Sequence, residues 1–209
     1  RTGVLDDLRQ GLRYVWGWKA LMALAGVGVT IHMFGRAAGS LSPLLVLDHF
    51  KAGAAGLGWW QSSDGIGLVL GGIVLGVWGG FRRKVVTQLM FLALYGLAIL
   101  LVGLLPSNGF WLAIGLIFIS GFSEAILLGL GGTIFQTLVP PEMQGRVFSL
   151  LISLSMAAMP LGLLLAGPTA AVPGASSWWA LTGAVFMGTA ATAMTIPAVA
   201  RREDREGGI

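Results

Sequence analysis

Four ionisable side chains stand inside long apolar runs of this sequence: His32, Arg36, Asp64 and Glu124. A charged group in the hydrocarbon core of a bilayer costs about 3 kcal/mol or more unless it is paired or hydrated, so such residues mark ion pairs, polar cavities or proton pathways. A carboxylate can bind and release a proton, and histidine titrates near neutral pH. The residue types therefore predict proton-linked chemistry in a cavity within a membrane.

The helical rise of about 1.5 Å per residue gives the depth of each group below the outer ends of the apolar runs. His32 and Glu124 lie roughly 22 and 21 Å deep, and Arg36 and Asp64 roughly 16 and 12 Å. His32 and Arg36 are four residues apart and share a helix face. We therefore expect a polar cavity between the first and fourth apolar runs.

Two interpretations of these groups are open. In the first, Glu124 is the protonatable coupling group of the cavity and His32 is its relay. Arg36 then pairs with Asp64, as a gate or as a structural clamp. In the second, Glu124 only forms a hydrogen bond between helices, and the Arg36–Asp64 pair is a buried structural ion pair. We favour the structural role for the pair.

The elements that must position these groups are membrane-spanning helices. The chain has 209 residues, 56% hydrophobic and only 11% charged, with a mean hydropathy of +0.83. A soluble domain usually carries about 25% charged residues, and an apolar run of about 20 residues crosses a bilayer. We expect an all-α membrane protein with a six-helix transmembrane bundle over 20–199. Its spans are expected at about 20–47, 56–79, 85–105, 110–138, 146–171 and 177–199.

The segments outside the bundle are polar. Residues 1–19 are expected to form a cytoplasmic amphipathic helix on the membrane surface, and 200–209 a cytoplasmic tail. The chain opens with Arg1 rather than methionine, so we expect a fragment of a longer protein.

Charge predicts that both termini are cytoplasmic. Basic residues concentrate in cytoplasmic loops, and only Lys51 falls on the opposite side, with Arg36 inside a span. The remaining Lys and Arg residues all lie on one side: Arg1, Arg9, Arg13, Lys19, Arg82, Arg83, Lys84, Arg146, Arg201, Arg202 and Arg205.

Tryptophan supports the same spans. Its ring is apolar while its N–H needs a wet partner, so it favours membrane interfaces. All eight tryptophans stand near expected span ends: Trp16, Trp18, Trp59, Trp60, Trp78, Trp111, Trp178 and Trp179.

Glycines mark one face of the second expected span. Gly67 and Gly71 are four residues apart, as are Gly72, Gly76 and Gly80. Small residues at this spacing let helix backbones approach closely. We expect this span to pack against other helices rather than lipid, and either rocking helices or tight static packing explains the glycines.

Enzyme, metal and nucleic-acid functions find little support. There is no cysteine and only two histidines, so thiolate and His-Glu-x-x-His metal sites are excluded. The basic residues flank apolar runs instead of forming a phosphate-binding face. Gly121-Phe-Ser123-Glu124 lacks the second glycine of a nucleophile elbow. We expect no enzyme activity, no cofactor and no metal.

Two segments resemble the major facilitator superfamily of transporters. Residues 71–84, GGIVLGVWGGFRRK, resemble the loop between the second and third helices of each half of those proteins. Residues 139–151, VPPEMQGRVFSLL, with MPLGLLLAGP at 159–168, closely resemble the C-terminal half of the drug:proton antiporter-3 branch, which includes macrolide-efflux-like proteins. DLRQGLRYVW at 7–16 looks like the segment before that half's first helix.

The resemblance implies a C-terminal six-helix half of a twelve-helix fold, in which two bundles rock about a substrate path. It also implies gating or bracing roles for two cytoplasmic loops. The usual loop aspartate is replaced here, with Gly79 and Gly80 near its place, so the acidic member of the motif's charge relay is missing. The residues concerned are Arg82, Arg83, Lys84, Glu142, Gly145 and Arg146.

The second loop also has a physical explanation. Pro140 and Pro141 are expected to end one helix, Gly145 to permit a tight turn, and Arg146 to mark the inner face. Glu142 and Arg146 would then cap and brace helix ends.

The expected function is proton-coupled export of drug-like or lipophilic small molecules by alternating access, in a bacterial cytoplasmic membrane. Its partners would be the lipid bilayer, the small-molecule substrate, protons and a missing N-terminal six-helix half, with no nucleic acid. Two alternatives remain: a half-transporter that works with a second copy of itself, and a membrane scaffold with no transport cycle.

Overall fold

The computed structural model describes residues 19–81, 83–171 and 174–195. The expected surface helix before Lys19, the loop residue Arg82 and the tail 200–209 lie outside these ranges. Within them the chain is helical and contains no strand, which agrees with the all-α prediction.

The first segment of the fold, residues 19–49, is a broken rod. It consists of α2 (Lys19–Thr30), η1 (Ile31–Gly35), α3 (Arg36–Ser40), α4 (Ser42–Leu44) and η2 (Leu45–His49), of which η1 and η2 are π-helices. The longer helices that follow are α5 (Gly53–Trp78), α6 (Lys84–Leu104), α7 (Phe110–Leu138), α8 (Pro141–Ala171) and α9 (Ala175–Thr195).

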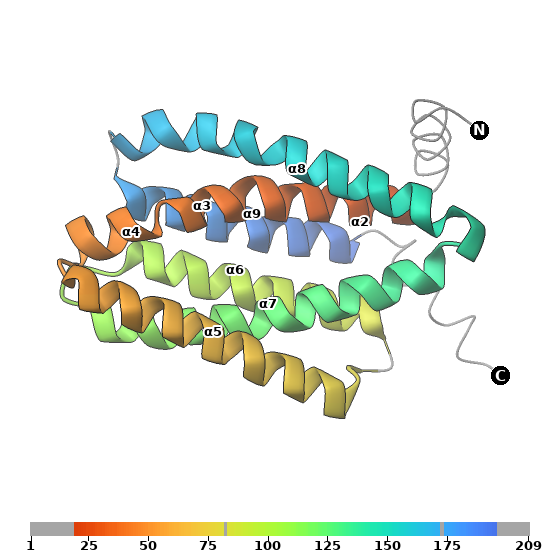
Figure 1. The fold of residues 1–209 in the computed structure, drawn as a ribbon, viewed down its shortest axis with the longest axis horizontal. Helices are drawn as coiled ribbons and strands as arrows, with labels where there is room; N and C mark the ends of the chain where they lie inside the picture. Colours follow the sequence, from red (N-terminus) through yellow and green to blue (C-terminus); the bar gives the residue numbers. More distant parts are fainter. Residues whose placement is uncertain (1–18, 82, 172–173, 196–209) are drawn as a thin grey trace.

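Successive rods run in opposite directions (Figure 1), and the closest neighbours are α5 with α7 and α6 with both α7 and α9. The start of α2, the end of α9 and the α5–α6 and α7–α8 connections therefore gather at one end of the molecule. Of the described basic residues, Lys19, Arg83, Lys84 and Arg146 belong to this end. Lys51 follows η2 at the opposite end.

The first segment differs from the single span expected over 20–47, because it breaks at Leu41. Pro43 has no N–H to bond the carbonyl four residues earlier. The Ser42 hydroxyl donates to that carbonyl, at Gly39, over 2.8 Å, and the Ser40 hydroxyl donates to the Ala37 carbonyl over 2.7 Å. The kink is thus caused by Pro43, and the two serine hydroxyls supply hydrogen bonds to the backbone carbonyls at the break.

Two helix pairs are held together by glycine contacts. In the α5–α7 pair, the backbones of Gly67 and Gly71 lie directly against the backbone of α7, with no room for a side chain. In the α6–α9 pair, a Cβ added at Gly96 would stand 2.9 Å from the Gly183 carbonyl oxygen. Small residues therefore set how closely these helices approach.

The predicted glycine stripe is confirmed on one face of α5 only. A Cβ added at Gly72 or at Gly76 would meet no other atom within 4 Å. The outward side of α5 carries large apolar residues, among them Val69, Ile73 and Val77, exposed by 60%, 57% and 87%. The prediction that this span packs against other helices therefore holds for its Gly67–Gly71 face, which contacts α7, while the opposite side stays exposed.

The tryptophans that the structure describes include an exposed group and a buried group, while Trp16 and Trp18 lie outside the described ranges. Trp59 and Trp111 are 57% and 69% exposed, as expected of an interfacial belt. Trp60, Trp178 and Trp179 are each only 4% exposed, and the rings of Trp60 and Trp179 meet edge to face at 5.3 Å. These three are core residues, because helix ends pack tightly at this end of the bundle.

Three of the described helices are long and apolar enough to cross a membrane by length and composition. They span Lys84–Leu104, Phe110–Thr137 and Pro141–Ala166. α5 and α9 contain a larger share of glycine, serine and threonine than these three helices, which lowers their mean hydropathy.

Candidate functional site

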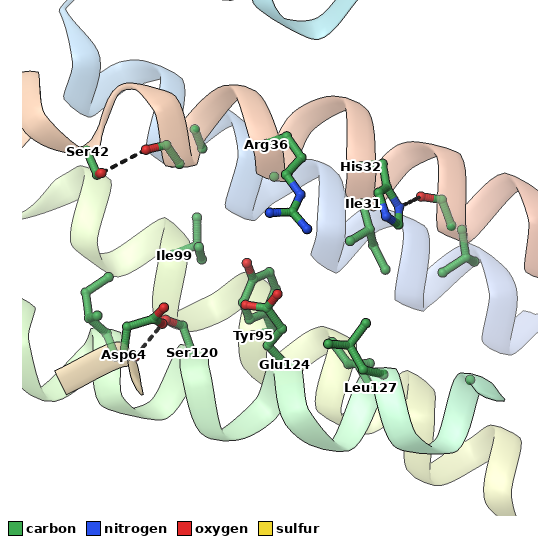
Figure 2. Close-up of a pocket in the computed structure, with 18 of the residues that line it drawn as sticks. Ile31, His32, Arg36, Ser42, Asp64, Tyr95, Ile99, Ser120, Glu124 and Leu127 are labelled. Carbon is green, nitrogen blue, oxygen red and sulfur yellow. Dashed lines mark hydrogen bonds between the residues drawn. The ribbon is translucent and has the colours of Figure 1, made fainter. Parts of the chain in front are cut away.

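A cavity of about 690 Å³ lies between the first segment and helices α5, α6 and α7, with single residues from α8 and α9 completing its wall. We call it the central cavity (Figure 2). Much of its lining is apolar, including Ile99, Ile117 and Leu127. Its polar lining consists of His32, Arg36, Ser40, Ser42, Gln61, Asp64, Gln88, Tyr95, Ser120 and Glu124.

The sequence brings α7 to the cavity through one helical face. Ile117, Ser120, Glu124, Leu127 and Gly131 recur three or four residues apart and all line the cavity, as one side of an α-helix requires. The Ser120 hydroxyl is directed to the Ile117 carbonyl at 2.8 Å. Glu124 is therefore the one acidic group that α7 presents to the cavity.

His32 lies in the π-helix η1, a local widening of the helix that is frequent at functional sites. Its Nδ1 lies 2.9 Å from the Gly28 carbonyl oxygen. A carbonyl only accepts, so Nδ1 carries the proton and Nε2 is the ring nitrogen left for a partner in the cavity. His32 also interacts electrostatically with Glu124, in line with their similar predicted depth.

Arg36 begins α3, directly after the π-helix. Its guanidinium extends from the first segment into the cavity (Figure 2) and interacts electrostatically with Glu124 and Tyr95. The expected ion pair between Arg36 and Asp64 is not formed in the part of the chain that the structure describes. Equal depth along two helices did not place these two side chains face to face.

Asp64 is held instead by the close α5–α7 contact. A Cβ added at Gly121 would stand 2.9 Å from the Asp64 Oδ1 atom, so the carboxylate lies against the α7 backbone. Its charged neighbour is Glu124, with which it interacts unfavourably. The two carboxylates thus share one cavity, and Arg36 and then His32 are the groups that interact favourably with ionised Glu124.

Tyr95 completes this group and was missed by sequence reasoning. It comes from α6, and its ring stacks on the fully buried Phe186 of α9 with centroids 5.5 Å apart. Its hydroxyl end reaches the cavity beside Glu124 (Figure 2). A tyrosine inside an apolar helix was the available signal, because a buried phenol needs a polar partner.

The two predicted gating loops lie away from the cavity. Gly79 and Gly80 end α5 with φ of 72° and 83°, the left-handed conformation that glycine adopts without strain. Lys84 is the first residue of α6, and Arg83 precedes it. These positions place the basic residues at the α5–α6 connection.

The second loop is shorter than expected. α8 begins at Pro141 rather than near residue 146, because proline suits the first turn of a helix. Glu142, Gly145 and Arg146 are therefore helical, and Gly145 makes no turn. Glu142 lies in the first helical turn, where its charge complements the helix dipole.

Gln144 is a second residue that sequence reasoning missed. Its Nε2 donates to the carbonyls of Gln136, over 3.1 Å, and Val139, over 2.9 Å. These carbonyls belong to the end of α7, which has no further helical N–H to bond them. Gln144 thus joins the end of α7 to the start of α8.

Comparison with known proteins places these features in context. Residues 17–208 match the family described as Major Facilitator Superfamily. Macrolide efflux protein A of Streptococcus pyogenes is 30% identical over 184 residues, which are 88% of this chain and 45% of that protein. Macrolide efflux protein A of Enterococcus faecalis is 31% identical over 160 residues, 76% of this chain and 49% of that protein.

Multidrug efflux pump Tap of Mycolicibacterium fortuitum is 31% identical over 172 residues, 82% of this chain and 41% of that protein. The chain therefore spans less than half the length of these relatives. No solved structure matches it significantly.

Proposed function

Because this chain belongs to the Major Facilitator Superfamily, we propose that it is the C-terminal half of a proton-coupled exporter of drug-like or lipophilic small molecules. The observation that carries this proposal is the central cavity, which combines apolar walls with Glu124, Asp64, Arg36 and His32. The efflux names of its relatives supply the direction of transport.

The cavity suits a drug-sized molecule. Small-molecule sites usually enclose about 300–1,000 Å³ and present mostly apolar surface with a few placed polar groups. The central cavity, at about 690 Å³, falls within that range. Aromatic walls at Trp60 and Trp179 would hold the apolar body of such a substrate.

Glu124 is the proposed proton-coupling group. In the ionised form it is attracted by Arg36 and His32 of the first segment. Protonation removes that attraction, so the electrostatic attraction between the first segment and α7 is present only while Glu124 is ionised. A ligand shifts a conformational equilibrium only through such a difference between states.

Six membrane spans with cytoplasmic termini are part of the proposal. The alternating direction of the rods and the position of Lys19, Arg83, Lys84 and Arg146 at one end support it. Arg82, Arg83 and Lys84, with Glu142, Gly145 and Arg146, would then brace the cytoplasmic ends of the helices during rocking.

Transport by the complete reading frame in inverted membrane vesicles tests the function. An imposed pH gradient, acid inside, should drive uptake of radiolabelled erythromycin or of ethidium. Glu124→Gln should abolish the dependence on the gradient. Ser123→Ala should retain it, because that buried hydroxyl bonds the Ile119 carbonyl and does not line the cavity.

Two results would contradict the proposal. Gradient-driven uptake that survives Glu124→Gln unchanged would remove Glu124 from coupling. Absence of uptake of either probe by the unmodified protein would favour the scaffold alternative. A second copy as the missing half would appear as a dimer of the 21.8 kDa chain when its mass is measured in detergent by light scattering.

A further inference from the structure

Tyr95 is the one described tyrosine, and its ring packs against the apolar clusters that contain its neighbours on α6. The neighbouring buried residues of that helix, such as Leu92 and Ile99, pack into apolar clusters. The Tyr95 ring is fixed by stacking on Phe186, with an interplanar angle of 24°. A phenol on a fixed ring has a fixed oxygen position, because only the hydroxyl hydrogen can still rotate.

The charges around that oxygen come from three different elements. Glu124 of α7, Asp64 of α5 and Arg36 of α3 all act on Tyr95. The remaining charged group that lines the cavity, His32, acts on Glu124. The stacked Phe186 of α9 brings no charge.

Figure 2 shows the Tyr95 hydroxyl pointing into the cavity, into which Arg36 and Glu124 also project. That hydroxyl makes no hydrogen bond among the described residues. The Tyr95 side chain is half-buried and lines the cavity, where Arg36 and Glu124 both form strong hydrogen bonds with a suitable partner.

We propose that Tyr95 is a positioning residue for Glu124, whose hydroxyl bridges the Arg36 guanidinium and the ionised Glu124 carboxylate. The inference rests on the proposed function, because it deepens the coupling role of Glu124. It links the first segment to α7 through a side chain of α6.

The bridge follows from the donors and acceptors available. Arginine only donates, an ionised carboxylate only accepts, and a phenol does both. The phenol oxygen accepts from Arg36 while its O–H donates to ionised Glu124. Protonation removes the negative charge of Glu124, so the charge-assisted hydrogen bond from the phenol weakens to an ordinary one to the remaining carbonyl oxygen. The Tyr95 proton stays on the phenol throughout.

Tyr95→Phe tests the bridge, since phenylalanine keeps the stacked ring and removes only the hydroxyl. Uptake of ethidium by vesicles of the complete protein is measured between pH 5 and pH 9. Loss of a donor to the ionised carboxylate favours the protonated form. We expect the midpoint of the pH profile to move up by about one unit, a tenfold change in proton binding, while the maximal rate stays within about twofold.

Thr87→Val is the matched control. Thr87 is on the same helix, is fully buried and does not line the cavity, and its hydroxyl bonds the Arg83 carbonyl over 3.0 Å. Its pH profile should match that of the unmodified protein. In the Glu124→Gln background, Tyr95→Phe should produce no further change in the profile.

The outcomes separate the two proposals. If Glu124→Gln leaves the pH profile unchanged, the proposed coupling function fails. If Glu124→Gln abolishes it while Tyr95→Phe leaves the midpoint in place, only the bridge is overturned. An infrared difference spectrum gives a readout independent of transport, because the carboxylic C=O band of Glu124 should shift in Tyr95→Phe. An unshifted band would also overturn the bridge.

Discussion

Replacing Gly71 by alanine should loosen the α5–α7 pair that carries Asp64 and Glu124. The added Cβ would stand 3.0 Å from both the Ala125 Cβ and the Phe122 carbonyl carbon, and closer still to the Phe122 carbonyl oxygen. Carbon atoms in good contact are about 3.5–4.0 Å apart. Because backbone atoms cannot turn aside as a flexible side chain can, the two helices must separate.

Gly72→Ala provides the comparison, one residue along the same helix. Nothing lies within 4 Å of its added Cβ, so it keeps the helix-propensity gain of about 1 kcal/mol that alanine has over glycine. Overpacking typically costs about 1–3 kcal/mol. The free energy of unfolding of Gly71→Ala should therefore be about 1–3 kcal/mol below that of Gly72→Ala.

The assay is unfolding in mixed micelles with increasing SDS, followed by the near-ultraviolet circular dichroism of the tryptophans. If the two variants have equal free energies of unfolding, or if Gly71→Ala is the more stable, the glycine contacts are not the basis of α5–α7 packing.

Two further predictions concern backbone groups held by side chains. Ser42→Ala should lower the free energy of unfolding by about 1–2 kcal/mol, because it leaves the Gly39 carbonyl without the hydroxyl that donates to it. In a Pro43→Ala background, which restores a backbone N–H, the effect measured by the same SDS titration should largely vanish. An undiminished loss of stability in that background would contradict the explanation of the kink. Gln144→Leu should lower it by about 1–2 kcal/mol through loss of two hydrogen bonds to the end of α7, and should speed proteolysis at the α7–α8 connection; unchanged proteolysis would count against this clamp.

The helical class and the superfamily could be predicted from the sequence, and both are confirmed. Apolar runs long enough to cross a bilayer are a direct consequence of helix geometry. The loop motifs at 71–84 and 139–151 carried the family, which the match over 17–208 bears out. The relatives that the chain matches are named as efflux proteins, in line with the expected transport function.

Which charged side chains face one another across helices was harder to predict from the sequence. Depth estimates grouped Arg36 with Asp64, but depth along a helix does not give rotation about it. The glycine contact at Gly121 holds Asp64 against α7, and the π-helix η1 alters the rotation of the first segment before Arg36. Both depend on how helices pack, which no single helix encodes.

Tyr95 and Gln144 show a second limit. The polar group of each interacts with a different element of the fold: Tyr95 with the charged groups of the cavity, and Gln144 with the end of α7. A charged residue inside an apolar run can be recognised from the sequence alone, because the free-energy cost of a charge in the bilayer makes such residues rare. A phenol or an amide costs less to bury and gives a weaker signal.

Cysteine labelling tests the central claim most directly, because this chain contains no cysteine of its own. Single cysteines are placed at Gln61 and Gly132, which line the central cavity, and at Ile73 and Val77, on the outward apolar side of α5. In the complete protein in membranes, a water-soluble maleimide should label the first two, and erythromycin or ethidium should protect them. The positions at Ile73 and Val77 should stay unlabelled in lipid. Labelling of the outward positions, or cavity labelling that neither probe affects, would contradict a substrate path through this cavity.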